Sequence, residues 1–345
     1  MPEKPALTDE QIIDCLRDEY GLDVEQISYL ALGADVDSSV YRVITKNGKD
    51  YFLKSRKGNF NEASVIIPSF LSAAGISQVI PPLSTQKDRL WANIEPFKVI
   101  LYPFVEGQAA LDIKMSEGQW IEFGTALKRF HTTEFPAAMT RSIPKDDFSS
   151  RWRDKVNMHL ERLEGQVFRE PLQVAAAAFL RSKRIETLEI AKRAEQLARM
   201  VQDELPEFVL CHSDIHGYNL FIDNHGALYI VDWDGLVFAP RERDLMFIGG
   251  GHGHSGYTPR EEEAMFYQGY GETKINQIAL VYYRYERIVK DIVADCDVIF
   301  LSEEGEEVQM GALEDLNNKF SPDSYIEIAY RSDQVLKKQV IPHKP

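Results

Sequence analysis

The sequence has few cysteines and no long apolar run. Its three cysteines, Cys15, Cys211 and Cys296, lie far apart and form no CxxC pair. This disfavours a disulfide framework and is typical of a reduced, cytoplasmic chain. No apolar segment approaches the ~20 residues that span a bilayer, and residues 1–5 lack the basic and apolar character of a signal peptide. The sequence therefore predicts a cytoplasmic protein that is not inserted in a membrane.

Basic side chains are also scarce, with 39 Lys and Arg against 54 Asp and Glu and a net charge of −15. Such an excess of negative charge argues against nucleic acid and anionic membranes as partners, and it favours cationic ligands or serves solubility alone. A chain of 345 residues with 44% hydrophobic content is long and apolar enough for two packed lobes. Nothing in the pattern indicates an oligomer, so we expect a monomer.

Candidate functional residues concentrate in one loop and the hairpin that follows it. An apolar strand, residues 207–211, precedes the loop His212–Asn219. Residues 220–222 and 228–231 then form two predicted strands around turn residues 224–226. The hairpin would bring Asp232 back towards Asp214 and Asn219. Oxygen ligands of this kind suit Mg²⁺ beside substrate phosphates, whereas an apolar core would not tolerate unpaired carboxylates.

The spacing of the loop residues narrows the chemistry. His212, Asp214 and Asn219 match the His-x-Asp-x-x-x-x-Asn catalytic loop of protein kinases, in which a metal-binding Asp follows a later strand. Asp214 would accept the proton of the attacking hydroxyl, and Asn219 and Asp232 would hold metal ions. One alternative is a polar loop with an Asx-turn. Another is a zinc hydrolase that uses His212, Asp214 and His216, but it leaves Asn219 unexplained.

The N-terminal part predicts a five-stranded antiparallel sheet with one helix packed on it. Thr8 and Gln11 fit a capping box, so a helix should run over residues 8–20. A second helix is expected over residues 60–74, ended by Gly75. The predicted strands are Gln26–Leu32, Ser38–Thr45, Asp50–Ser55, Arg89–Ala92 and Lys98–Tyr102.

A nucleotide would use residues spread over this sheet. Lys54, on the third strand, corresponds to the kinase lysine that contacts the α- and β-phosphates, although alone it reads as a strand-end lysine in water. Glu62 is placed either to pair with Lys54 or to interact with its own helix dipole. Tyr102 and Phe104 would contact adenine or belong to the core. The small residues of the first loop and second strand offer backbone N–H groups to phosphates: Gly33, Ala34, Asp35, Ser38 and Ser39.

The C-terminal part is predicted to be mainly helical. Helices are expected over residues 116–132, 148–163, 171–204 with one break, 261–270 and 276–295. Asp244 is expected to be a buried carboxylate that supports the loop at His212, with a salt bridge to Arg241 or Arg243 as the alternative. A polar set either forms solvated ion pairs or walls a cleft for a polyhydroxylated or amine-bearing substrate: Asp234, Arg284, Arg287 and Asp291.

Together these residues resemble a known family. Residues 211–216 with Asn219, and Val231–Asp234, are similar to the aminoglycoside phosphotransferase and choline kinase family. Residues 241–251 and 283–289 resemble its spectinomycin-phosphorylating members in particular. Ser213 stands where many members have Gly, and Trp233 replaces the Phe of the protein-kinase metal motif. Neither departure touches the carboxylates.

The resemblance implies a bilobal, protein-kinase-like α+β fold. Residues 1–103 would form a nucleotide-binding lobe with a hinge near 101–107, and residues 104–345 a larger catalytic and substrate-binding lobe. It implies ATP and Mg²⁺ as cofactors, with Asp214 as base and Lys54 on the phosphates. The acceptor would be a hydroxyl of a small, cationic, polyhydroxylated molecule, with spectinomycin the first candidate. A metabolic kinase for amino-sugars, choline-like amines or other alcohols and a nucleotide-binding pseudokinase are the alternatives.

Overall fold

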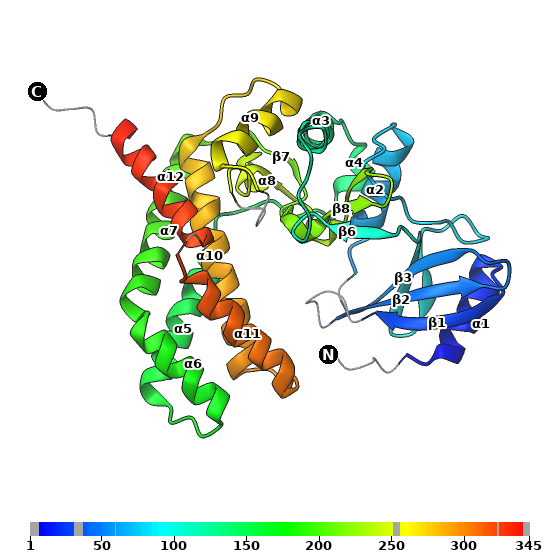
Figure 1. Cartoon of the computed structure of the whole chain (residues 1–345), viewed down its shortest axis with the longest axis horizontal. Helices are drawn as coiled ribbons and strands as arrows, with labels where there is room; N and C mark the ends of the chain where they lie inside the picture. Colours follow the sequence, from blue (N-terminus) through cyan, green and yellow to red (C-terminus); the bar gives the residue numbers. More distant parts are fainter. Residues whose placement is uncertain (1–6, 31–36, 59, 251–255, 323, 341–345) are drawn as a thin grey trace, which may run out of the picture.

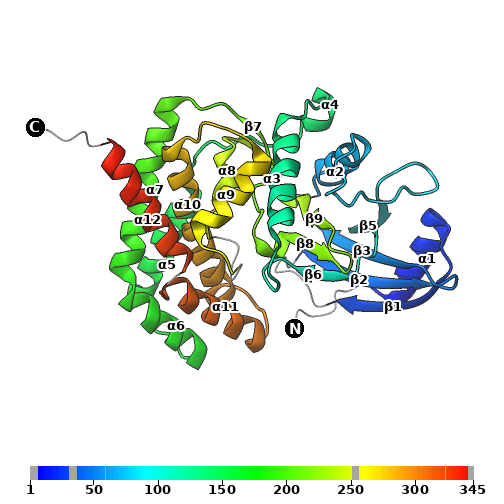
Figure 2. The same ribbon diagram turned by 45° about the horizontal axis from the view of Figure 1, so that its top comes forward.

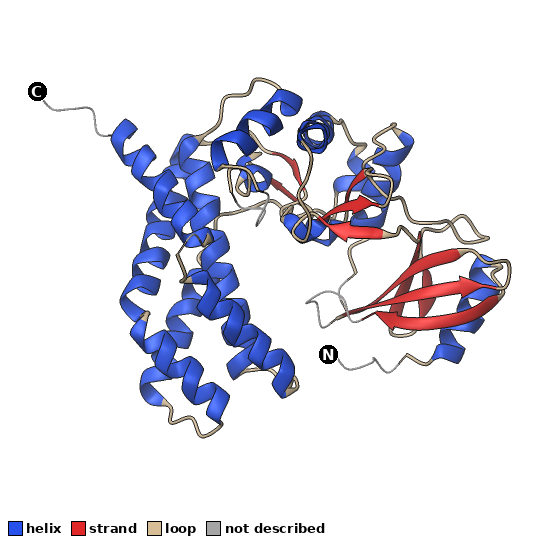
Figure 3. Cartoon of the chain, in the orientation of Figure 1, coloured by secondary structure: helices blue, strands red, loops and turns tan. Residues whose placement is uncertain are grey.

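The chain folds into two lobes of unequal size in an α+β arrangement (Figures 1 and 3). The computed structural model describes residues 7–30, 37–58, 60–250, 256–322 and 324–340. Strands gather in the smaller lobe and beside the junction, whereas long helices make up most of the larger lobe (Figure 3). The predicted fold class is therefore confirmed.

The smaller lobe is a sheet covered by its first helix. Helix α1, Asp9–Tyr20, begins with the predicted capping box at Thr8 and ends at Gly21 in the left-handed conformation. Its apolar face packs on one side of the sheet, and together they form a core of their own. The buried members of that core are Leu7, Ile12, Cys15, Leu16, Tyr41, Val43, Leu53, Ala92, Val99 and Leu101.

Five strands form this sheet in the order β1-β2-β3-β5-β4, and every neighbouring pair is antiparallel. The strands are β1 Val24–Leu30, β2 Ser38–Thr45, β3 Asp50–Lys57, β4 Ala92–Ile94 and β5 Phe97–Pro103. The strand expected at Arg89–Ala92 is displaced. Thr85 and Arg89 close a tight loop in which Asp88 has a φ of 57°, so pairing with β5 begins only at Ala92.

Helix α2, Ala63–Ala73, connects the two lobes. It begins three residues later than expected, where the Asn61 side chain accepts a hydrogen bond from the Ala63 N–H. Its buried residues Ala63, Ile67 and Leu71 belong to the hydrophobic core of the larger lobe, not to that of the sheet. The boundary near residues 101–107 stays a prediction, because this helix from the first segment shares the second core.

Short strands bring the predicted loop and hairpin to the junction. Strand β6, Gly107–Ala109, pairs with β8, Leu220–Asp223, which pairs in turn with β9, Leu228–Ile230. The predicted hairpin is thus confirmed. Strand β7, Val209–Cys211, pairs with β10, Val237–Ala239, on the other side of the loop. The loop between β7 and β8 is therefore held at both ends by backbone pairing.

Helices build the rest of the larger lobe around α10, Gln277–Phe300, which packs against α5, α7, α11 and α12 (Figure 1). The other long helices are α3 Glu117–Thr132, α5 Arg151–Gly165, α6 Pro171–Ser182, α7 Arg184–Glu204, α9 Pro259–Tyr270, α11 Glu306–Lys319 and α12 Tyr325–Val340. Two short ones are α4 Ala137–Thr140 and α8 Glu242–Leu245. The break expected within 171–204 falls at Lys183. Among the described residues, none of the helices combines the length and apolarity needed to cross a bilayer.

Helices α3 and α9 approach each other closely (Figure 2). A Cβ added at Gly269 would lie 1.8 Å from the Ile121 backbone oxygen, and one at Gly124 would lie 2.1 Å from the Phe266 oxygen. Since backbone atoms cannot move aside as side chains do, both positions require the absence of a side chain. This contact fixes α3, which carries His131 towards the site described below.

We expect Gly269→Ala to destabilise the protein by about 1–3 kcal/mol, because the helices must separate to admit a methyl group. Gly311→Ala is the matched control, since its Cβ would meet nothing within 4 Å on α11. Replacing glycine by alanine at this position should instead stabilise the helix by about 0.5–1 kcal/mol. Urea denaturation measures both changes. Equal effects of the two substitutions would contradict the proposed close packing.

Candidate active site

The backbone of the loop after β7 is fixed by its own side chains and by neighbouring carbonyls. The His212 Nε2 lies 3.0 Å from the Val231 oxygen, which ties the loop to the end of the hairpin. The Ser213 hydroxyl donates to the Gly235 oxygen at 2.6 Å, and Ser213 adopts a φ of 72°. A positive φ is costly for a residue with a side chain. The loop therefore needs strong external support.

Asp244, at 0% exposure, supplies that support from α8. Its carboxylate accepts the His212 N–H at 2.9 Å and the Ser213 N–H at 2.6 Å. The His131 Nε2 lies 2.9 Å from the same carboxylate, and its Nδ1 lies 2.7 Å from the Tyr270 hydroxyl. The structure places Asp244 against the loop backbone as the sequence indicated, without a described ion pair to Arg241 or Arg243.

His131 and Asp244 also lie beside Cys211, and ligand atoms of the three are within 4.8 Å of one another. Each group already has a hydrogen-bond partner, because the Cys211 thiol reaches the Ala239 and Pro240 oxygens at 3.6 Å. Burial also raises the pKa of the Cys211 thiol well above its usual value, so the metal-binding thiolate is disfavoured. We interpret this trio as a buried hydrogen-bond network, not as a metal site.

Asp214 projects from the loop towards α10. One of its carboxylate oxygens is bound by Arg287, and the other lies 3.6 Å from the His216 Nε2. Burial alone would raise the pKa of Asp214, but the nearby His216 and the positive charge of Arg287 outweigh it. They hold the pKa well below its usual range, so the carboxylate is ionised at neutral pH.

Asn219 ends the loop, and Asp232 follows the hairpin that comes after it. The Asn219 amide nitrogen donates to the Asp214 backbone oxygen at 2.8 Å, which leaves its side-chain oxygen turned away from that carbonyl. The Val231 N–H donates to the Asn219 backbone oxygen at 3.0 Å and so places Asp232 beside the loop. Asp232 has a φ of 64° and a half-exposed side chain. One carboxylate and one amide oxygen form a donor set that suits a hard cation such as Mg²⁺.

Lys54 reaches this site from the smaller lobe. Its Nζ lies 2.9 Å from Asp232 and 2.6 Å from Asp234, which also binds Arg56. Burial alone would lower the pKa of Lys54, but the two carboxylates outweigh it and raise the pKa above its usual range. Asp234, expected on a substrate surface, is part of this interlobe cluster and also lines the cavity described below, so its role at a substrate stays a prediction.

The structure describes only some of the remaining residues that were predicted to bind a nucleotide. Ser38 and Ser39 begin β2 opposite Arg56 and Ser55 of β3. Tyr102 lies on β5, and the Phe104 ring is covered by the Arg42 guanidinium at 4.4 Å. Gly33, Ala34 and Asp35 lie outside the described residues. Their roles at a nucleotide remain predictions.

Two expectations need correction. Of the two alternatives for Glu62, the ion pair with Lys54 is not found among the described contacts, because the Lys54 Nζ is bound by Asp232 and Asp234. Glu62 lies at the start of α2, as the helix-dipole alternative requires, and it lines a neighbouring cavity. Arg284 does not wall a cleft, because it is 6% exposed and donates to the Met246 oxygen at 2.9 Å and to the Ile248 oxygen at 2.6 Å. Sequence spacing placed Arg284 beside Arg287 but did not reveal these backbone partners. Arg287 and Asp291, by contrast, form an ion pair next to Asp214.

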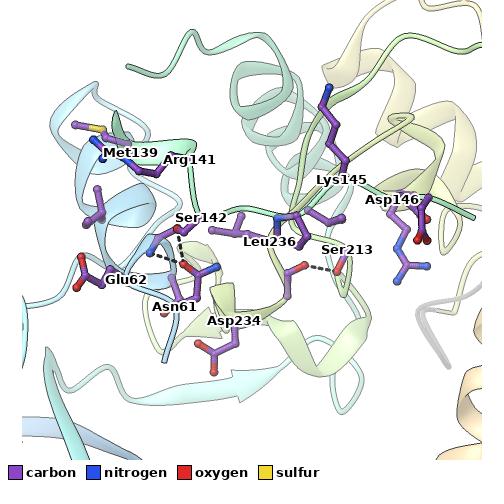
Figure 4. A pocket seen from close by; sticks show the side chains of 18 of the residues that line it. Asn61, Glu62, Met139, Arg141, Ser142, Lys145, Asp146, Ser213, Asp234 and Leu236 are labelled. Atoms are coloured by element: carbon purple, nitrogen blue, oxygen red, sulfur yellow. Dashed lines mark hydrogen bonds between the residues drawn. The ribbon is translucent and has the colours of Figure 1, made fainter. Parts of the chain in front are cut away.

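A cavity of about 990 Å³ opens beside this site (Figure 4). It lies between the start of α2, the segment around residues 138–149, residues Ser213 and Asp234–Val237, and α10. The Ser142 hydroxyl donates to the Asn61 side chain at 2.9 Å across it. Sequence reasoning missed several further polar lining residues, because four distant segments supply them without a motif: Asn61, Arg141, Ser142, Lys145, Asp146, Asp147, Arg243 and Glu286.

Comparison with known proteins agrees with this geometry. Residues 28–279 match the model of the phosphotransferase enzyme family that includes the aminoglycoside phosphotransferases. The chain belongs to this family. The predicted family resemblance and reaction class are therefore confirmed: the protein is a phosphotransferase.

Solved structures show the same fold over nearly the whole chain. Spectinomycin phosphotransferase APH(9)-Ia in complex with ADP and spectinomycin is 30% identical, covers 96% of this chain and 100% of its own, and superposes with a TM-score of 0.88. An aminoglycoside phosphotransferase from Alicyclobacillus acidocaldarius is 16% identical, with 98% of each chain covered and a TM-score of 0.61. Protein StrN of Streptomyces griseus is 24% identical over 183 residues. These residues make up 50% of this chain and only 55% of that relative.

The buried carboxylate generates a prediction about stability. Asp244→Asn replaces an oxygen that accepts a backbone N–H by an amide that cannot do so, and we expect a loss of about 2–4 kcal/mol. Asp203→Asn, on the exposed end of α7, should change stability by less than about 0.5 kcal/mol. Chemical denaturation of both variants is the measurement. An Asp244→Asn protein as stable as the Asp203→Asn control would refute the supporting role.

Proposed function

We propose that this phosphotransferase transfers the γ-phosphoryl group of ATP to a hydroxyl of a small, cationic, polyhydroxylated molecule, with spectinomycin as the first candidate. The observation that carries the proposal is the gathering of Lys54, Asp214, Asn219 and Asp232 at one junction, with Lys54 Nζ 2.9 Å from Asp232. These residue types match the parts needed for phosphoryl transfer: a phosphate-binding cation, metal ligands and an acceptor for the hydroxyl proton.

The nucleotide would bind between the lobes. Lys54 would contact its phosphates, and Tyr102 and Phe104 near the hinge would flank the adenine. Asn219 and Asp232 would hold Mg²⁺, which when bound would neutralise charge on the phosphates. ADP in the structure of spectinomycin phosphotransferase supports a nucleotide here, because that protein aligns over 96% of this chain.

The main role of Asp214 would be to orient the attacking hydroxyl. Removal of the hydroxyl proton before the transition state would contribute less. Phosphoryl transfer passes through a loose transition state in most analyses, so positioning and electrostatics dominate. Because Arg287 keeps the Asp214 carboxylate ionised and binds one of its oxygens, the oxygen on the His216 side remains for the hydroxyl. A fixed, charged acceptor of this kind suits a hydroxyl that must lie in line with the leaving group.

The cavity beside Ser213 and Asp234 would receive the body of the acceptor. Asp146 and Asp147 line it with carboxylates, and Arg141 and Lys145 with cations. Such a mixed lining matches a molecule that carries hydroxyls and ammonium groups together. Near Asp214 the neighbours Arg287 and Lys290 are cationic. An ammonium group of the acceptor would therefore lie away from the reacting hydroxyl and towards the cavity.

Spectinomycin-dependent release of ADP from Mg²⁺-ATP tests the proposed reaction. We expect turnover with the unaltered protein and a loss of at least about 10²-fold in Asp214→Asn, with ATP binding nearly unchanged. ATP binding without ADP release for spectinomycin would reject that acceptor, and a panel of amino-sugars, choline-like amines and other alcohols would follow. ATP binding without turnover on any member of the panel would favour a pseudokinase.

Arg287 should act through Asp214. We expect Arg287→Gln to lower kcat by about 10–100-fold, because the carboxylate loses its fixed orientation, with little change in KM for ATP. Arg260 is an exposed arginine in the first turn of α9, so Arg260→Gln is the control and should retain activity.

The decisive comparison is a double-mutant cycle with Asp214→Asn. Once Asp214 can no longer accept the proton, Arg287→Gln should cause little further loss. Fully additive effects of the two substitutions would show that Arg287 does not act through Asp214.

A further inference from the structure

Three side chains surround the Asp234 carboxylate, two from strand β3 and one from helix α2. The carboxylate binds Lys54 Nζ at 2.6 Å and also Arg56, and the Ser64 side chain of α2 lies beside it. Only 24% of the Asp234 side chain is exposed. One carboxylate therefore joins β3 and α2 to the segment that follows the hairpin.

The local backbone explains why these groups meet. Lys54 and Arg56 are two residues apart on β3, so both side chains lie on the same face of the sheet. Asp232 and Asp234 flank Trp233, which is buried and donates its Nε1–H to the Ile230 oxygen at 3.1 Å. The Trp233 ring also packs edge-on against Phe130 and His212. Anchoring this residue turns the two flanking carboxylates towards the two cations.

Helix α2 offers no substitute for Asp234. Its sequence from Ala63 to Ala73 contains no Asp or Glu. The carboxylate of Glu62, just before it, has no described hydrogen bond or ion pair, and Figure 4 shows it apart from that of Asp234. The pairing of a strand lysine with a helix glutamate, as in protein kinases, is therefore absent from the described part of this structure.

We propose that Asp234, and not Glu62, is the carboxylate that positions Lys54 for the nucleotide phosphates. The inference rests on the proposed function in one respect, that a nucleotide binds at Lys54. Lys54 contacts both Asp232 and Asp234 in this structure. If Asp232 bound a metal ion, Asp234 would still hold the ammonium group, and Arg56 would balance its charge. Asp234 is thus a positioning residue that acts through Lys54.

Two isosteric substitutions separate the alternatives. Asp234→Asn and Glu62→Gln each remove one negative charge near α2 at almost constant size. Isothermal titration with Mg²⁺-ATP, without an acceptor, measures nucleotide affinity directly. We expect Asp234→Asn to weaken binding by about tenfold or more and Glu62→Gln to change it by less than about twofold. The opposite order would overturn the proposal.

A purely structural role for Asp234 would lower affinity whatever residue stands at position 54. We therefore expect Asp234→Asn to have little further effect in a Lys54→Ala background, whereas additive losses would overturn the positioning role. Asp234→Glu should recover part of the affinity. If Asp234→Asn does not fold, a crystal structure of the unaltered protein with Mg²⁺-ATP decides: Lys54 Nζ within hydrogen-bond distance of Asp234 supports the proposal, and pairing with Glu62 overturns it.

These measurements also separate this inference from the proposed function. Loss of acceptor-dependent turnover on every acceptor, with tight ATP binding, rejects the proposed reaction and leaves the role of Asp234 standing. Failure of the unaltered protein to bind Mg²⁺-ATP would reject both.

Discussion

The hydrogen bonds to the buried Asp244 carboxylate are the interaction on which the rest of the site depends. A carboxylate at 0% exposure is costly unless donors surround it, and two successive loop N–H groups and His131 do so. In return the loop is held in a conformation that includes Ser213 at a positive φ. Asp214 follows directly, so its direction is determined by a residue that does not touch any reactant.

Hydrogen bonds connect the loop next to Asp244 with the hairpin that follows it, and ion pairs then connect the hairpin with the smaller lobe. Asn219 donates to the Asp214 backbone, and Val231 donates to Asn219, so the loop and the hairpin form one hydrogen-bonded unit that ends at Asp232. The smaller lobe contributes cations on β3, and the hairpin contributes the anions that meet them. The site therefore exists only when the lobes are joined, and contacts such as that of Arg129 with the Gly75 oxygen help to join them.

Sequence could predict what is encoded locally. Turn residues at 224–226 and alternating apolar residues define the hairpin, and the spacing from Asp214 to Asn219 is preserved because both lie on one short loop. Contacts between side chains from elements far apart in the chain leave no such local pattern, so the sequence does not predict them. The sequence offered Glu62 as a partner for Lys54, whereas the structure pairs Lys54 with Asp232 and Asp234, on either side of the buried Trp233. Arg284 and Arg287 share one helix, yet one faces carbonyls and the other faces Asp214.

The same distinction explains why the reaction class is easier to infer than the acceptor. Phosphoryl transfer places its demands on a few charged atoms around the phosphates, and in the proposed site one loop, one hairpin and one strand would supply them. The cavity beside them is built from α2, the segment around residues 138–149 and α10, whose side chains have no common geometric requirement. Under the proposed function, a change of acceptor would need new side chains in the cavity and would leave the anchor at Asp244 and the position of Asp214 unchanged.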